Sequence, residues 1–135
     1  MIEDSTVVYE IVFPSPPERL WQALVDPREL AAWLMPAPGF APVTGQRFTM
    51  ACDPFGEISG EVIEVIPHAR LSMRWTGSFG DTIVTFQLEP ERSGTRLRLT
   101  HGGWDEAHAA FRDQFRGGWH TKIGEGLSAL LSAAA

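Results

Sequence analysis

The sequence has little cysteine, few basic residues and no long apolar run. Cys52 is the single cysteine among 135 residues, which excludes an internal disulfide framework and favours a reducing compartment. Eleven lysines and arginines stand against 17 aspartates and glutamates, a net charge of −6, and the basic residues are scattered along the chain. A nucleic-acid partner would favour a basic face, so none is expected. No apolar run approaches the roughly 20 residues that span a bilayer.

The sequence also lacks the usual signals of a signal peptide, a metal site, a nucleotide site and a serine nucleophile. Residues 1–4 carry no positive charge, so we expect a cytoplasmic protein without a signal peptide. No two histidines stand four residues apart and there is no cysteine pair, so no zinc site is expected. The chain has no Gly-x-Ser-x-Gly sequence, and its glycines form no phosphate-cradling pattern ahead of a helix. We therefore expect no cofactor, and no catalytic motif decides whether the protein is an enzyme.

The length of the chain and the absence of repeats, low-complexity tracts and linkers predict one domain over residues 1–135. Its first strand is predicted from Thr6 to Phe13, a β-branched and aromatic segment with Tyr9, Ile11 and Phe13 on one face. This strand is expected to contribute one apolar face to the core.

Two helix starts follow the first strand. Ser15 is expected to be the N-cap of the first helix, with Pro16 at the first helical position and Glu18 closing a capping box. Asp26 and Pro27 repeat the start signal at once. The segment therefore predicts two short consecutive helices.

Apolar and polar residues alternate through much of the middle of the chain, which is typical of half-buried strands. The four strand candidates are Gln46–Cys52, Glu57–Ile66, Leu71–Trp75 and Thr82–Leu88. Turns rich in glycine and proline separate them, the first over residues 53–56. In the second candidate the pattern is ambiguous. Val62 and Glu64 share one face while Ile63 and Val65 share the other, so we expect either a bulge or burial on both faces.

The last third of the chain combines a strand with a long aromatic helix. Leu97, Leu99 and His101 alternate with polar residues, so His101 is expected on an inward strand face. The apolar period then changes to that of one helix face. This stripe is Phe111, Phe115, Trp119, Ile123, Leu127 and Leu130. Glycines at 117, 118, 124 and 126 each cost roughly 1 kcal/mol against alanine, so they indicate a kink, a close backbone approach or two shorter helices.

This element order predicts an α+β protein in which a six-stranded antiparallel sheet buries one face under the C-terminal helix. Several motifs stand in the same order: Ser15-Pro16-Pro17-Glu18-Arg19-Leu20-Trp21, Asp26-Pro27, Gly60-Glu61-Val62-Ile63-Glu64-Val65-Ile66-Pro67, Leu99-Thr100-His101-Gly102-Gly103-Trp104 and Gly118-Trp119. Together with the element order, they resemble the family of heat-shock protein 90 ATPase activator homologues. That family belongs to the START and birch-pollen-allergen-like (SRPBCC) superfamily of helix-grip folds.

The resemblance implies a curved sheet wrapped on the C-terminal helix, with an elongated apolar cavity between them. It implies no single reaction, because the family shares no catalytic motif and many bacterial members are stand-alone domains of unassigned activity. The eukaryotic co-chaperones of the family carry a further N-terminal domain, which has no counterpart in this sequence. We therefore expect chaperone activation to be the least favoured function.

A ligand in the implied cavity is the first functional hypothesis. An empty void of about 300 Å³ would cost on the order of 7 kcal/mol. That cost approaches the whole stability of a domain, about 5–15 kcal/mol. The gap is therefore filled by its own rings, open to water or occupied by a ligand. The candidate ligand-binding residues are Trp33, Phe48, Met50, Met73, Trp75, Phe86, His101, Trp104, Phe111, Phe115 and Trp119.

Two polar side chains are weak candidates for acid–base catalysis. His101, with an ordinary pKa near 6.5, could bind a ligand or act as a general base, although a core histidine bonded to a backbone carbonyl is the commoner arrangement. Glu64, if it shares the inward face of Val62, would need a partner such as Arg74. Otherwise Glu64 is a solvated charge on the outer face of the sheet.

Three functions are therefore open. The first is a carrier or sensor that binds a small apolar molecule, lipid-like or aromatic. The second is an enzyme of the cyclase or dehydratase kind found elsewhere in the superfamily, with His101 or Glu64 as its acid–base group. The third is an interaction module that makes a weak contact with a chaperone or with a second copy of the chain.

Overall fold

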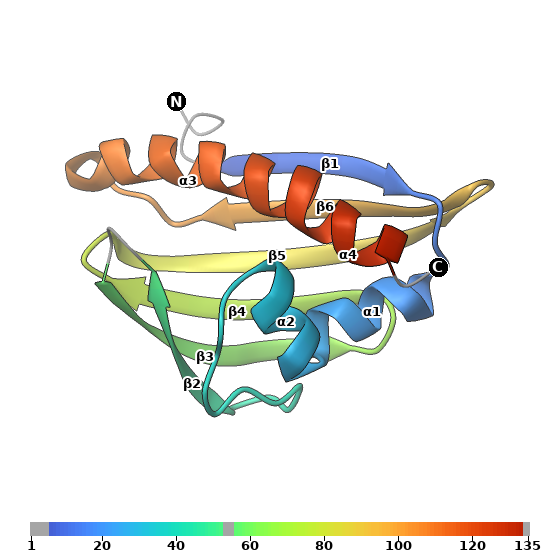
Figure 1. Cartoon of the computed structure of the whole chain (residues 1–135). Helices are drawn as coiled ribbons and strands as arrows, with labels where there is room; N and C mark the ends of the chain where they lie inside the picture. The colour runs from blue at the N-terminus through green and yellow to red at the C-terminus, as the bar shows by residue number, and fades with distance from the viewer. Residues whose placement is uncertain (1–5, 53–55, 134–135) are drawn as a thin grey trace.

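The computed structural model describes residues 6–52 and 56–133, in which six strands form one antiparallel sheet (Figure 1). The strands are β1 (Val7–Phe13), β2 (Arg47–Cys52), β3 (Gly56–Ile66), β4 (Arg70–Gly77), β5 (Gly80–Glu91) and β6 (Gly94–Gly102). Their order across the sheet is β1-β6-β5-β4-β3-β2, so every pair except β1 and β6 joins consecutive strands. Residues 53–55 of the first predicted turn and residues 1–4 lie outside the described residues.

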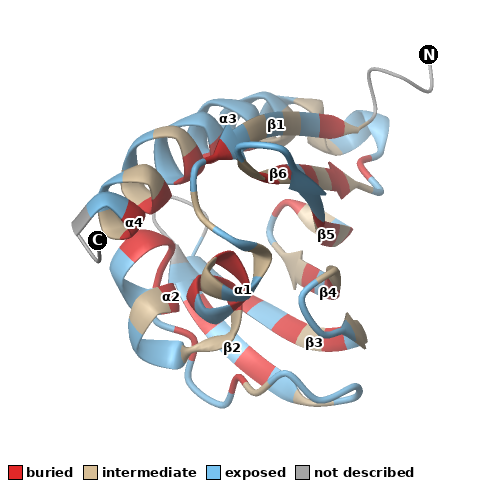
Figure 2. Ribbon diagram, turned by 90° about the vertical axis from the view of Figure 1, so that its right-hand side faces the viewer, coloured by how far each residue is buried: buried red, intermediate tan, exposed pale blue. Residues whose placement is uncertain are grey.

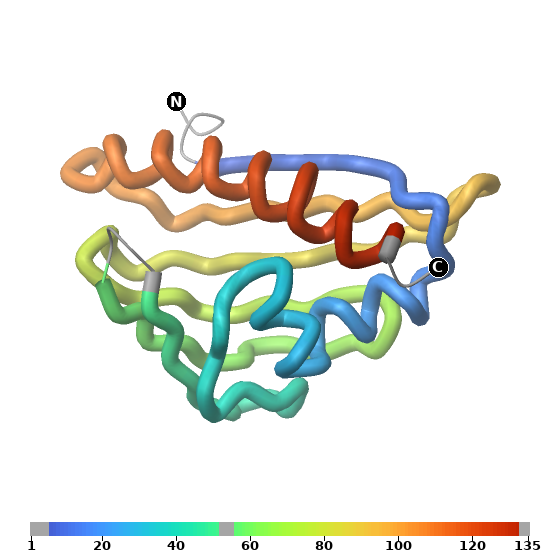
Figure 3. The backbone as a smooth tube through the Cα atoms, viewed as in Figure 1, coloured from blue at the N-terminus to red at the C-terminus, as the bar shows by residue number. Residues whose placement is uncertain are grey.

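Helices close the concave side of the sheet. They are α1 (Pro17–Val25), α2 (Pro27–Trp33), the 3-10 turn η2 (Glu106–His108), α3 (Ala109–Thr121), the π-helical segment η3 (Lys122–Leu127) and α4 (Ser128–Ala133). From α3 through η3 to α4 the chain forms one continuous helical segment beside β1 (Figure 3). Figure 2 shows the sheet curling from β1 round to β2, with the helices along its open side. This is the α+β helix-grip architecture that the sequence predicts.

Alternation along the strands places apolar side chains on the concave face of the sheet. Met73 and Trp75 on β4 and Val84 and Phe86 on β5 are each at most 1% exposed. Met73 lies directly opposite Val84 in the antiparallel register. Because successive side chains point to opposite faces, one buried face follows from the apolar pattern alone. The half-buried strands predicted from the alternation of apolar and polar residues are confirmed for β4 and β5.

The ambiguous segment of β3 contains a bulge between Val62 and Glu64. Val62 is buried opposite Met73, whereas Glu64 lies on the outer face, with its Oε1 2.6 Å from Arg70 Nε. One extra residue in a strand reverses the facing of everything that follows it. The bulge is therefore confirmed, and the alternative of a buried Glu64 paired with Arg74 is wrong.

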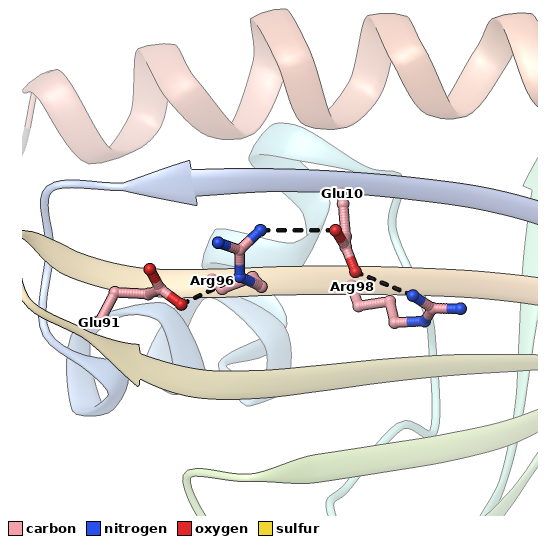
Figure 4. Close-up of polar contacts among 4 residues, drawn as sticks. All are labelled: Glu10, Glu91, Arg96 and Arg98. Atoms are coloured by element: carbon pink, nitrogen blue, oxygen red, sulfur yellow. Dashed lines mark hydrogen bonds and ion pairs between the residues drawn. The ribbon is translucent and has the colours of Figure 1, made fainter.

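The outer face of the sheet carries paired charges (Figure 4). Glu10 on β1 accepts hydrogen bonds from Arg96 at 3.4 Å and from Arg98 at 2.8 Å. Glu91 accepts a further bond from Arg96 Nε at 3.0 Å, and this bond raises the pKa of Arg96. Solvent screens exposed pairs of this kind, so they contribute little to the stability of the fold. They mark this face as solvated rather than as the core side.

The first helix begins one residue later than predicted. Pro16, not Ser15, is the N-cap of α1, and no side chain caps it. Ser15 instead offers its carbonyl oxygen to Thr95 Oγ1 at 2.7 Å, which ties the chain to β6. The second helix begins as predicted, since an Asp26 carboxylate oxygen accepts a bond from Arg28 N at 2.9 Å.

The glycines of the terminal helix form two pairs with different environments. A Cβ at Gly124 would stand 2.8 Å from Tyr9 Oη, and one at Gly126 would stand 3.1 Å from the Trp33 carbonyl oxygen. Both glycines lie in η3 and allow it to approach β1 and α2 closely. A Cβ at residue 117 or 118 would meet nothing within 4 Å. The predicted close approach is confirmed for the second pair and wrong for the first, which is exposed and does not interrupt α3.

Candidate ligand-binding site

Aromatic side chains from the sheet and from the terminal helix meet between the two layers. Trp75, Phe86 and His101 project inward from β4, β5 and β6. Phe115 and Trp119 project from α3, where their i, i+4 spacing puts both on one face. We call these five side chains the aromatic cluster. Each of them is at most 5% exposed. The structure therefore brings together five of the predicted ligand-binding residues.

The rings of the aromatic cluster contact one another directly. Trp75 and Trp119 stack with ring centroids 5.5 Å apart and planes at 30°. The Phe115 ring lies 4.9 Å from that of His101, and the Phe86 ring meets Trp119 edge-on at 5.8 Å. Such contacts contribute about 0.5–1.5 kcal/mol per pair beyond the area they bury. This part of the gap between sheet and helix is filled by the protein's own rings.

A chain of hydrogen bonds crosses the cluster through His101. Its Nδ1 accepts from Trp119 Nε1 at 3.0 Å, and its Nε2 lies 2.8 Å from Thr82 Oγ1. Thr82 Oγ1 in turn donates to the carbonyl oxygen of Trp75 at 2.9 Å. An indole N–H can only donate, so Nδ1 must be the acceptor and Nε2 carries the proton of the neutral ring. Both ring nitrogens are therefore committed to partners within the protein.

His101 is held in its neutral form. It is fully enclosed, and burial lowers the pKa of its imidazole from 6.5 to about 3, because a cationic ring cannot be hydrated there. A general base works best with a pKa near the operating pH and a free lone pair. This arrangement supplies neither, so the geometry supports a role for His101 in orienting Trp119 and Thr82.

Trp104 and Phe79 extend the cluster toward the start of α3. Trp104 Nε1 donates to the carbonyl oxygen of His101 at 2.8 Å. Phe79 is fully enclosed, and its ring centroid lies 5.0 Å from that of Phe115. Phe79 is not among the predicted ligand-binding residues, because it stands between the strand candidates Leu71–Trp75 and Thr82–Leu88. In the structure β4 and β5 stay paired as far as Gly77 and Gly80. A large aromatic residue in a glycine-rich turn was the signal that could have identified it. Phe111 is half-buried at the edge of this core.

The other predicted ligand-binding residues lie along the rest of the concave face. Met50 on β2 and Met73 on β4 are each 1% exposed. Trp33, at the end of α2, meets the Phe86 ring edge-on at 6.0 Å. Phe48 on β2 is 4% exposed. These residues continue the apolar layer from the aromatic cluster toward β2 and α2.

One polar atom of the cluster has no hydrogen-bond partner. Trp75 Nε1 is enclosed, and within the described part of the chain it is the single buried side-chain nitrogen or oxygen without a partner. Native proteins rarely leave a buried donor unpaired, so such an atom calls for an explanation. The Trp75 ring itself contacts the rings of His101, Phe115 and Trp119.

Two surface grooves lie outside the aromatic cluster. One, of about 540 Å³, lies over β2, β3 and β4 and includes Arg47, Glu61 and Arg74. The other, of about 470 Å³, lies between β1 and α4 and includes Ile11 and Leu131. No member of the aromatic cluster lines either groove. The candidate Glu64 is on the outer face and does not join the cluster.

Among the described residues, no helix is both long enough and apolar enough to cross a bilayer. No three histidine, cysteine, aspartate or glutamate side chains among them gather in a way that could hold a metal ion.

Comparisons with known proteins place these features in a family context. The model of the family described as activator of Hsp90 ATPase homolog 1-like protein matches residues 14–132. A solved protein from Mesorhizobium loti is 33% identical, with a TM-score of 0.87, over 96% of this chain and 98% of that chain. One from Rhodobacter sphaeroides is 28% identical, with a TM-score of 0.79, over 98% and 95%. The Aha1 dimer from Colwellia psychrerythraea is 23% identical, with a TM-score of 0.69, over 90% and 98%, which shows a shared fold. No curated protein sequence matches.

Proposed function

Because the chain belongs to the family of activator of Hsp90 ATPase homolog 1-like proteins, we propose that it uses the helix-grip fold to bind a small apolar ligand. The ligand, lipid-like or aromatic, lies between the concave face of the sheet and the C-terminal helix. The observation that carries the proposal is the layer of aromatic and methionine side chains between these two elements. The titratable member of the aromatic cluster, His101, is neutral, so the layer suits an uncharged apolar molecule.

Adaptable side chains supply the room that a ligand needs. An open void of about 300 Å³ would cost on the order of 7 kcal/mol, so a gap closed by side chains that can swing aside is the more stable arrangement. Met50 and Met73 are unbranched and polarizable, which lets them repack around different shapes. They lie on the concave face beside the aromatic layer.

Enzymatic turnover has less support in the geometry. Both nitrogens of His101 are hydrogen-bonded, and Glu64 pairs with Arg70 on the outer face. The cyclase or dehydratase hypothesis therefore lacks an acid–base group at the aromatic cluster. The chaperone contact and the cytoplasmic location stay predictions from the sequence and the family. Self-association is favoured by one observation, the dimer formed by the Colwellia relative, and sedimentation equilibrium of the purified protein tests it.

Thermal unfolding with a panel of fatty acids, flavonoids and a naphthalene dye tests ligand binding. A compound at 100 times its dissociation constant stabilises the folded state by about 2.7 kcal/mol. For a domain of this size that raises Tm by about 10 °C. Met73→Phe, which replaces an adaptable side chain with a stiff ring, should reduce the shift. Val8→Phe, at an exposed position on β1, should preserve it.

The proposal is overturned if no compound of the panel shifts Tm and native mass spectrometry of freshly purified protein shows no added mass. The apolar layer then serves only as the hydrophobic core of the domain. A shift that Met73→Phe leaves intact would move the binding site away from the concave face.

A further inference from the structure

Every side-chain donor around His101 is matched with an acceptor, except one. The Trp119 indole donates to the ring of His101, and the Trp104 indole donates to its carbonyl oxygen. His101 Nε2–H is directed at Thr82, whose own proton goes to the carbonyl oxygen of Trp75. Hydrogen bonds therefore run without a break from Trp119 on the helix through His101 and Thr82 to the backbone of β4. The N–H of the Trp75 indole remains without an acceptor.

The sheet register explains why neither cross-strand neighbour of Trp75 supplies that acceptor. Its partners across the sheet are Gly60 on β3 and Thr82 on β5. Gly60 has no side chain, and the Thr82 hydroxyl is engaged with His101. The Trp119 ring covers a face of the indole rather than approaching its N–H end on. Burying an indole N–H without an acceptor is unfavourable, and a phenylalanine would avoid it.

We propose that the N–H of Trp75 is the polar anchor of the ligand, which carries an uncharged hydrogen-bond acceptor oxygen on an otherwise apolar body. A ketone, an ester or an aryl ether has this chemistry. The oxygen accepts the indole proton while the apolar body lies against the neighbouring rings and methionines. The inference rests on the proposed ligand binding and adds the group that selects among apolar ligands.

The same surroundings disfavour other polar groups on the ligand. The aromatic cluster contains no charged side chain, so a carboxylate placed beside Trp75 would lose its hydration without gaining a counter-ion. A donor such as an amine would find both ring nitrogens of His101 already occupied. An uncharged hydrogen-bond acceptor is therefore the polar group that best complements the N–H of Trp75.

Paired ligands isolate the contribution of the oxygen. The probes are 2-acetylnaphthalene and 2-isopropenylnaphthalene, which have nearly the same shape and differ in a carbonyl oxygen replaced by a methylene carbon. Calorimetric titration gives the ratio of their dissociation constants for the wild type and for Trp75→Phe. Because the difference in hydration of the two probes is common to both proteins, the change in that ratio reports the hydrogen bond.

We expect the preference for the ketone to fall by about tenfold in Trp75→Phe. The control is Trp21→Phe on α1, where the tryptophan is buried against His68 and outside the aromatic cluster. This control loses an equal volume and should keep the wild-type ratio. An unchanged ratio in Trp75→Phe overturns the anchor.

A second measurement needs no substitution. In the wild-type protein labelled with ¹⁵N-tryptophan, the resonance of Trp75 Nε1–H should move downfield with 2-acetylnaphthalene and stay with 2-isopropenylnaphthalene. An equal response to both probes, or an upfield position showing that the N–H points at a ring face, overturns the proposal.

The outcomes separate this inference from the one it rests on. Binding of both naphthalenes with the same preference in every variant leaves ligand binding standing and removes Trp75 as its anchor. If neither probe binds and no compound of the thermal panel shifts Tm, both the anchor and the proposed ligand binding are removed.

Discussion

Acidification should destabilise the protein through His101. In the folded state burial lowers the pKa of this ring to about 3, whereas in the unfolded chain it returns to about 6.5. Between these two values the unfolded state binds a proton that the folded state does not. Stability from this group is therefore complete above pH 6.5 and is lost progressively as the pH falls from 6.5 toward 3.

The size of the loss follows from protonation of the unfolded chain alone. At pH 5.0, about 1.5 units below the unfolded pKa, the free energy of unfolding falls by about 2 kcal/mol. This figure holds for any folded-state pKa well below the working pH, so it does not depend on the depth of the shift. In a domain of this length it corresponds to a fall in Tm of about 6–10 °C.

Urea denaturation at pH 7.5 and at pH 5.0 measures this loss in the wild type and in His101→Gln. The glutamine amide can accept from Trp119 Nε1 and donate to Thr82 without taking up a proton. The two proteins differ only at residue 101, so the difference between the two losses belongs to His101. The wild type should lose about 2 kcal/mol more than the variant. Equal losses would refute a neutral, enclosed His101.

Two further substitutions test the packing around the site. Thr82→Val keeps the side-chain shape but leaves His101 Nε2–H without an acceptor, so urea denaturation should show a loss of about 1–3 kcal/mol; a neutral result would place the proton elsewhere. Gly118→Ala should raise Tm, because alanine gains roughly 1 kcal/mol in a helix and its Cβ meets nothing. Gly126→Ala should lower Tm, because its Cβ would stand 3.1 Å from the Trp33 carbonyl oxygen. Equal stabilisation by both alanines would contradict the close packing of η3 on α2.

Much of the fold could be predicted because strand and helix periods are local properties of the sequence. Alternation was enough to place Met73 and Trp75 on one face of β4, and i, i+4 spacing was enough to place Phe115 and Trp119 on one face of α3. The bulge could be named only as one of two alternatives, because the pattern around Glu64 does not say where the register shifts.

The polar contacts of the site could not be predicted in the same way. The hydrogen-bond partners of His101 lie 18 and 19 residues away in the sequence, on α3 and β5. Their meeting depends on the register of β5 against β6 and on the rotation of the helix, which are set by long-range packing. The unpaired N–H of Trp75 is even harder to predict from the sequence, because it depends on the absence, among the described residues, of any hydrogen-bond acceptor around it. Phe79 was missed for a related reason, since strand pairing extends into a segment with turn composition.

The most direct test of ligand binding between sheet and helix is to locate a bound probe by NMR. In the complex with 2-acetylnaphthalene, the methyl groups of Met50 and Met73 should show nuclear Overhauser contacts with the naphthalene protons. Contacts confined to Ile11 and Leu131, in the groove between β1 and α4, would place the ligand on the surface and contradict the proposed function.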